Sequence, residues 1–283
     1  MGMFDYDFMR LAFAGTTLVA LMAGPVGWFL LLRRQAFAAH ALPHAGFAGA
    51  GAAVWLGCAP LLGMVSATVL AGLAMACESP EPHNPFAPIR RDAMTGLVLT
   101  ASLGIGLWCL HRANGMASQA TNLLFGDVLG LTLGSLELLA GVLVASFALM
   151  GFLWRPLLFA SISPVQAAAR GVPMRLVGLL FMLAASLTAA ASSVVAGALL
   201  SFSLMIGPAA AALRLQLAPV PGVLFATMSA LLLSWGGLAL SWQDDAPVAF
   251  WIALGAVGLY AGSCLFMRLT SHKRGVAVRG EAP

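Results

Sequence analysis

Apolar stretches of about twenty residues recur along the whole sequence and limit what the chain can fold into. A helix needs roughly 20 such residues to cross the hydrocarbon core of a bilayer. Hydrophobic residues make up 61% of the chain and charged residues only 8%, against about 25% charge in soluble domains. We therefore predict an all-α, polytopic helical membrane protein with about eight or nine transmembrane helices, forming a single domain over residues 1–283. The candidate spans are 8–32, 36–57, 59–77, 93–111, 133–155, 174–192, 194–214, 220–240 and 248–267.

The positions of lysine and arginine predict the orientation of these spans. With the N-terminus outside, only Arg10 and Arg112 fall on the outer side. The inner ends collect Arg33, Arg34, Arg90, Arg91, Arg155, Arg170, Arg175, Arg214, Arg268, Lys273, Arg274 and Arg279. Such an excess marks the cytoplasmic side, so we expect residues 268–283 to form a cytoplasmic tail. The net charge of +4 follows from this topology and gives no case for a nucleic-acid partner.

Two histidines lie four residues apart in the second apolar stretch. On a helix His40 and His44 share one face and can offer two imidazole nitrogens to one ion. Ionisable groups inside a membrane are costly and tend to line a pathway or a site, and imidazole is the commonest metal ligand. We predict that the pair binds a metal ion, the alternative being that each imidazole hydrogen-bonds a neighbouring helix. Pro43, between them, is expected to bend the helix.

Small residues follow the histidines on the same helix. Ala45, Gly49, Ala53 and Gly57 recur every four residues and predict a smooth stripe on which another helix can approach closely.

Residues 163–171 carry the signals of a short cytoplasmic helix. Ser163 is a good N-cap, Pro164 suits the first helical position, and Gly171 is a natural terminator. Such a helix can dock into the groove of a partner, with Gln166 and Arg170 among its contacts, or it can be an interfacial connector.

Hydroxyl and small residues fill the stretch 186–213. Ser192, Ser201 and Ser203 can face a wet translocation path or simply allow close packing. Asp245, in a later loop, is a further pathway candidate. The boundary between two spans near Ser192 and Ser193 is either a tight turn or a break within one hairpin.

The four cysteines form no C-x-x-C pair, and we interpret them as packing residues. A bridge between Cys58 and Cys109 requires their Cα atoms to lie within about 7 Å.

Several motifs together resemble a known family. In chain order they are Leu31-Leu-Arg-Arg-Gln-Ala-Phe37, His40-Ala-Leu-Pro-His44-Ala, Leu124-Phe-Gly-Asp127, Ser161-Ile-Ser-Pro-Val-Gln-Ala-Ala-Ala-Arg-Gly171, Gly207-Pro-Ala-Ala210 and Ser241-Trp-Gln-Asp-Asp-Ala-Pro247. Nearly the whole chain resembles the permease subunit of zinc, manganese and iron ABC importers. In the second-span motif the family typically has Gly-Asp-Ala-Leu-Ser-His-Ala. Its histidine matches His44, whereas its aspartate falls on His40 and its serine on Pro43.

The resemblance implies a function and a set of partners. The metal-site role carries to His44 directly and to His40 by analogy, and the helix at 163–171 matches the family's coupling helix, with Ser163 in place of the usual acidic residue. The implied partners are an ATP-binding cassette subunit, an extracytoplasmic metal-binding protein and a second permease copy, in a bacterial inner (plasma) membrane. No permanently bound cofactor is expected, only transported Zn²⁺, or Mn²⁺ or Fe²⁺.

The residues themselves exclude some activities. A P-loop needs a lysine after G-x-x-x-x-G, and the only lysine, Lys273, has no such motif before it. ATP hydrolysis is therefore expected in a separate subunit. A membrane metallopeptidase of the H-E-x-x-H type needs a glutamate where Ala41 stands. An ATP-independent secondary metal carrier remains the alternative to an importer subunit.

Overall fold

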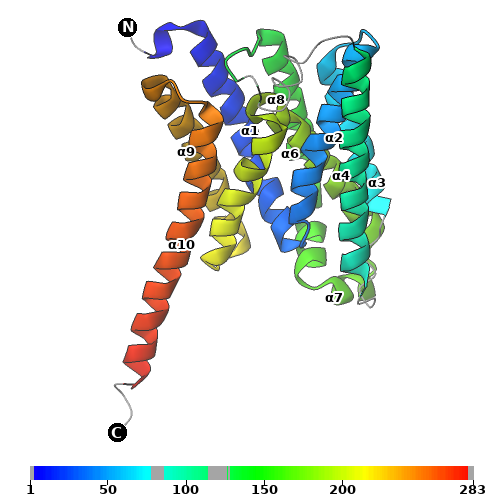
Figure 1. Cartoon of the computed structure of the whole chain (residues 1–283). Helices are drawn as coiled ribbons and strands as arrows, with labels where there is room; N and C mark the ends of the chain where they lie inside the picture. Colours follow the sequence, from blue (N-terminus) through cyan, green and yellow to red (C-terminus); the bar gives the residue numbers. More distant parts are fainter. Residues whose placement is uncertain (1–2, 78–85, 114–125, 127, 280–283) are drawn as a thin grey trace.

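The computed structural model describes residues 3–77, 86–113, 126 and 128–279, and every regular element in these ranges is helical (Figure 1). The elements are η1 (Met3–Asp5), α1 (Asp7–Leu32), α2 (Ala36–Trp55), α3 (Pro60–Cys77), α4 (Ala87–Arg112), α6 (Leu133–Ile162), α7 (Pro164–Ala169), α8 (Met174–Arg214), α9 (Pro219–Asp244) and α10 (Val248–Arg279). The start of α1 and the end of α10 lie at opposite ends of the bundle (Figure 1).

Most of these helices are long enough to cross a membrane. In the described residues, seven helices or half-helices have the necessary length and apolar composition, and Leu200–Arg214 is a shorter apolar helix. The polytopic helical fold class is thereby confirmed. α2 is not among the seven; its two histidines, its proline and its glycines lower its mean hydropathy.

α8 folds back on itself at Gly197, where the backbone adopts φ 78° and ψ 161°. Two contacts with α1 show the reversal: Phe29 meets Phe181 with ring centroids 6.3 Å apart, while Gly27 lies against the backbone of Met205. A straight helix would place Phe181 and Met205 roughly 36 Å apart. The break predicted near Ser192 and Ser193 is therefore real but stands at Gly197, because only glycine adopts this backbone conformation readily.

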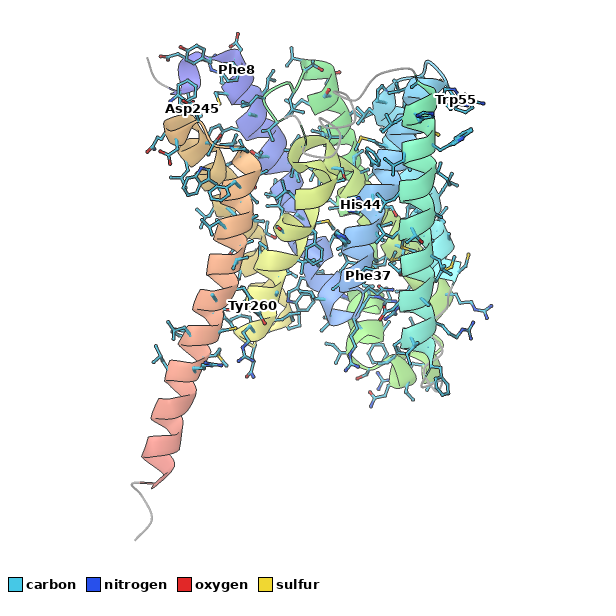
Figure 2. All side chains as sticks on the ribbon, viewed as in Figure 1. Phe8, Phe37, His44, Trp55, Asp245 and Tyr260 are labelled. Atoms are coloured by element: carbon cyan, nitrogen blue, oxygen red, sulfur yellow. The ribbon has the colours of Figure 1, made fainter. Side chains whose placement is uncertain are left out.

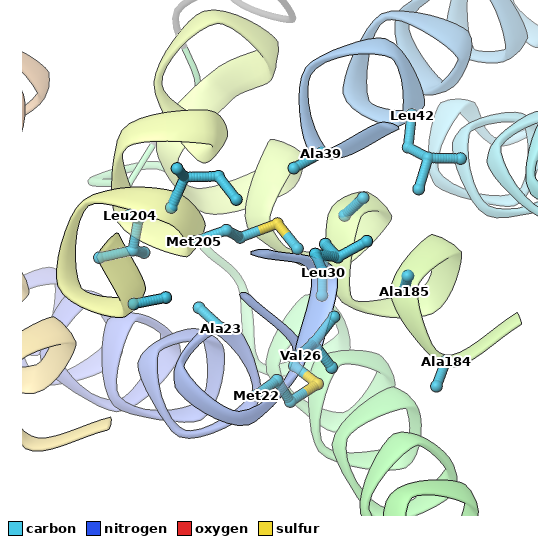
Figure 3. Packing of buried hydrophobic residues seen from close by; sticks show 14 of the residues in the cluster. Met22, Ala23, Val26, Leu30, Ala39, Leu42, Ala184, Ala185, Leu204 and Met205 are labelled. Carbon is cyan, nitrogen blue, oxygen red and sulfur yellow. The ribbon is translucent and has the colours of Figure 1, made fainter. Parts of the chain in front are cut away.

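The helices form two packed units. α2 lies between α3 and α4 and packs most extensively on them, whereas α1, α6, α9 and α10 pack around α8. The two units meet where α2 and α3 contact α8. In Figure 3, Leu42 and Ala39 of α2 face the core formed by α1 and both halves of α8.

The predicted stripe of small residues allows this close packing. Gly49 lies against the backbone of Gly63 on α3, and Ala53 lies against the same glycine. Gly57 instead stands beyond the end of α2, at φ 71°, and closes the helix. The stripe prediction is confirmed for Gly49 and Ala53. Gly57 instead forms part of the turn that ends the helix at its C-terminus.

Polar side chains inside the bundle are mostly satisfied within their own helices. Thr16 donates to the carbonyl of Ala12 and Thr68 to that of Met64. One hydroxyl pair joins two helices, Ser146 of α6 and Thr188 of α8, at 3.1 Å. All four cysteines are free thiols, so the bridge considered between Cys58 and Cys109 is not formed.

Candidate functional site

The structure brings the two predicted histidines together. α2 is continuous from Ala36 to Trp55 with Pro43 inside it. The ring centroids of His40 and His44 lie 4.8 Å apart, with an interplanar angle of 78°. His44 is 5% exposed and His40 is half-buried, and His44 lies at mid-height in the bundle (Figure 2). The pair is thus an imidazole couple inside the protein.

One nitrogen of the couple has no partner. His44 Nδ1 is buried and makes no hydrogen bond with any residue that the structure describes. Leaving such a group buried and unpaired costs roughly 1–3 kcal/mol. Among the described residues, no hydrogen bond of the kind that the alternative interpretation requires reaches this atom. An unpaired imidazole nitrogen is a group that an incoming cation can use.

The couple lacks a third conventional ligand from the described residues. No group of three or more His, Cys, Asp or Glu side chains in those ranges could hold a metal ion. Asp127, in the family motif, lies outside the described residues. An ion held by His40 and His44 would therefore fill its other coordination positions with water, hydroxyl or carbonyl oxygen, or with groups from elsewhere.

The predicted pathway residues lie in three different settings. Ser192 is fully buried, and its Oγ has no hydrogen-bond partner within the described part of the chain. Ser201 is also buried and donates to the carbonyl of Ala198 at 3.1 Å, whereas Ser203 is half-buried. Asp245 is exposed at the end of α9, far from His44 (Figure 2). There it lines a pocket of about 390 Å³ together with Trp242 and Phe8.

The short helix predicted within residues 163–171 is present as α7, Pro164–Ala169. Ser163 holds the N-cap position but its side chain makes no capping hydrogen bond, which corrects the expectation from sequence. Ser163 is also the C-cap residue of α6. Its backbone has ψ 73° and so does not adopt the extended geometry that is usual for an N-cap residue. Gly171 terminates the helix at φ 79°, as predicted, and Gln166 and Arg170 are exposed.

Sequence reasoning missed a contact between arginines near the same end of the bundle. Arg91 of α4 donates from Nη2 to the carbonyl oxygens of Arg33 and Arg34, at 3.3 and 3.1 Å. The guanidinium of Arg33 lies 5.4 Å from the ring centroid of Phe181 on α8. Burial, and then the charge of Arg91, lowers the pKa of Arg33 to about 10. The arginine pairs at 33–34 and 90–91 were visible in the sequence. The contact of Arg91 with the backbone of Arg33 and Arg34 was not.

These features together define a polytopic helical membrane protein with a paired-imidazole site in its interior and a short helix exposed at one end. The model of the ABC 3 transport family matches residues 5–267, and the chain belongs to this family. The predicted family resemblance is therefore confirmed. The chain is a permease subunit of a transporter and not an enzyme, with the ATPase on a separate subunit.

Individual relatives cover most of the chain. It is 27% identical over 275 residues to the manganese transport system membrane protein MntC of Halalkalibacterium halodurans, covering 97% of this chain and 91% of that protein. It is 29% identical over 224 residues to the high-affinity zinc uptake system membrane protein ZnuB of Haemophilus influenzae, covering 79% and 84%. Among solved structures, PsaBC from Streptococcus pneumoniae in complex with Fab has the same fold, with a TM-score of 0.80 at 22% identity, covering 93% and 92%.

Proposed function

We propose that this chain is the membrane-spanning permease subunit of an ATP-driven importer for a divalent transition-metal ion, and that the ion is zinc. The observation that carries the proposal is the couple of His40 and His44, with rings 4.8 Å apart and an unpaired buried nitrogen on His44. Two imidazoles at this spacing inside a membrane protein are better explained as ligands of a cation than as packing residues, because burying them there is costly.

The choice of zinc rests on ligand chemistry. Imidazole nitrogen suits zinc, whereas the resembled family typically has a carboxylate at the position of His40, and carboxylate oxygen suits manganese. Relatives named for manganese and for zinc both match this chain. A manganese or iron importer is therefore the alternative within the same function.

The proposal includes partners and an orientation. The arginines near the α7 end favour a cytoplasmic position for that end, with the start of α1 outside, in a bacterial plasma membrane. An ATP-binding cassette subunit would dock at the exposed residues of α7, among them Gln166 and Arg170. An extracytoplasmic metal-binding protein would deliver the ion to the opposite end, and a second copy of the permease would complete the assembly.

Replacing the two histidines tests the proposal. The complex of permease and ATPase is reconstituted in liposomes, and ATP-dependent uptake of zinc is measured. With both His40 and His44 changed to alanine, zinc uptake should fall at least about tenfold while the complex still assembles. His111→Ala, which removes an exposed histidine at the end of α4, is the matched control and should transport normally.

Two outcomes would contradict the proposal. Unchanged uptake in the double histidine variant would mean that the couple is not on the transport path. Zinc flux through the permease that proceeds equally without ATP or the ATPase would assign the chain to the secondary carriers.

A further inference from the structure

An aromatic ring from the second helical unit contacts the histidine couple. Phe202, on the returning half of α8, meets His40 edge to face, with ring centroids 5.7 Å apart and an interplanar angle of 85°. His40 in turn meets His44 at 4.8 Å and 78°. The three rings therefore form a continuous series of edge-to-face contacts that crosses from α8 to α2.

The segment that carries Phe202 is held firmly on both sides. Gly27 of α1 lies directly against the backbone of Met205, one turn further along α8. Gly207 lies against Ala256 of α10, since a Cβ at this glycine would stand 2.7 Å from the Ala256 Cβ. Close backbone packing of this kind leaves a helix little room to shift. The ring of Phe202 therefore contacts His40 from a helix segment that close packing holds in place.

Among the described residues, the ring of His40 is contacted by aromatic rings but receives no hydrogen bond. A histidine that binds a metal is usually oriented by a hydrogen bond from its second nitrogen. No hydrogen bond to the His40 side chain is found among the described residues, and the ring is in contact only with His44 and Phe202 among the aromatic rings there. Edge-to-face aromatic pairs contribute roughly 0.5–1.5 kcal/mol beyond the area they bury. That is enough to favour one rotamer of His40 over its alternatives.

We propose that Phe202 is a positioning residue of the metal site, which holds the imidazole of His40 in the orientation that lets it share an ion with His44. Its apolar ring also keeps water from the face of His40 that it covers. This inference rests on the proposed function, because it gives Phe202 a role only through the histidine couple. It adds to the site a residue from the helical unit that carries neither histidine.

Zinc binding to the purified complex in lipid nanodiscs provides the test, measured by competition with a colorimetric chelator. Phe202→Leu keeps an apolar side chain but removes the ring, and should weaken zinc binding about tenfold. Phe202→Tyr keeps the ring and should bind within about twofold of the unmodified chain. Phe225→Leu removes another half-buried ring that packs on the core, from α9, and should leave binding unchanged.

Two further measurements separate positioning from a general loss of structure. Cobalt, used as a visible probe of the ligand geometry, should give an altered absorption spectrum in Phe202→Leu and an unaltered one in Phe225→Leu. In a His40→Ala background, Phe202→Leu should cause no additional loss of zinc affinity, since the two changes act through one contact.

The inference is overturned if Phe202→Leu binds zinc and cobalt as the unmodified chain does. It is also overturned if the loss of affinity persists undiminished in the His40→Ala background. Either result, combined with loss of uptake in the double histidine variant, would leave the proposed function intact. Normal uptake in the double histidine variant would instead remove the proposed function itself.

Discussion

Gly49 of α2 and Gly63 of α3 face each other across a helix crossing with no side chain between them. A methyl group added to either residue would meet the carbonyl oxygen of the other. Ala53 lies one turn along on the same contact, where a Cβ on Gly63 would stand 2.6 Å from the Ala53 Cβ. The helix that carries the histidine couple is therefore held to α3 by backbone contact.

Gly49→Ala should destabilise the protein, because the two helices must separate to admit the methyl group. Overpacking of this kind typically costs about 1–3 kcal/mol. Thermal unfolding in detergent should show a lower midpoint than for the unmodified chain. Gly104→Ala, at an exposed position of α4 where an added methyl group has no neighbour within 4 Å, is the control and should be neutral or slightly stabilising. Equal midpoints for the two variants would contradict the packing described for Gly49.

Gly197→Ala should disrupt the reversal of α8. The conformation at φ 78° and ψ 161° is open almost only to glycine, and a side chain there costs about 1–3 kcal/mol. Gly126 also packs on the Gly197 backbone, since a Cβ at Gly126 would collide with the Gly197 nitrogen. Reduced yield of folded protein and a lower unfolding midpoint are the expected results, and a variant as stable as the parent would argue against the fold-back.

His40→Asp should shift the metal preference towards manganese. A carboxylate oxygen replaces an imidazole nitrogen, and oxygen ligands favour manganese relative to zinc. Uptake of each metal is measured in competition with the other in the reconstituted complex. The ratio of manganese to zinc should rise, whereas the control His111→Ala should leave it unchanged. An identical ratio for His40→Asp would show that position 40 does not discriminate between the metals.

Ala168→Pro tests whether α7 couples the permease to its ATPase. Position 168 lies past the first turn of α7, so the proline ring would clash with the preceding turn at a cost of about 3 kcal/mol or more. Gln166 stands within that first turn, where proline is better tolerated. Ala168 is exposed, so the change removes little packing.

The coupling experiment measures co-purification of the ATPase and metal-stimulated ATP hydrolysis. The proline variant should insert in the membrane but lose one or both. Gln166→Ala, which keeps the helix, should change neither by more than about twofold. Normal coupling in the proline variant would reject the assignment of α7 as the coupling helix.

The sequence predicted the helical membrane fold, the short helix α7 and the approach of His40 to His44 because each depends on local spacing. Helical periodicity alone places residues four apart on one face. The glycine stripe likewise indicated close packing on α2. By contrast, the reversal at Gly197 was expected near Ser192 and Ser193, since a stretch rich in alanine and serine has no strong stop signal and one glycine among small residues is inconspicuous.

Contacts between distant segments could not be predicted from the sequence. Phe202 reaches His40 only because α8 folds back and is held by Gly27 and Gly207. Arg91 reaches the carbonyl groups at the end of α1 from another helix. Both contacts depend on how separate helices pack against one another. The spacing of residues within one helix gives no information about this packing.

The fold-back at Gly197 has an electrostatic consequence for an ion near His40. The carbonyl end of the half-helix Met174–Ala198 and the amide end of the half-helix Leu200–Arg214 come together there. A helix terminus carries a partial charge of about half a unit, negative at the carbonyl end and positive at the amide end. Brought together, the two opposite partial charges largely cancel. On the proposed path, a cation approaching from that side would gain little from helix dipoles, and its recognition would rest on the imidazole nitrogens.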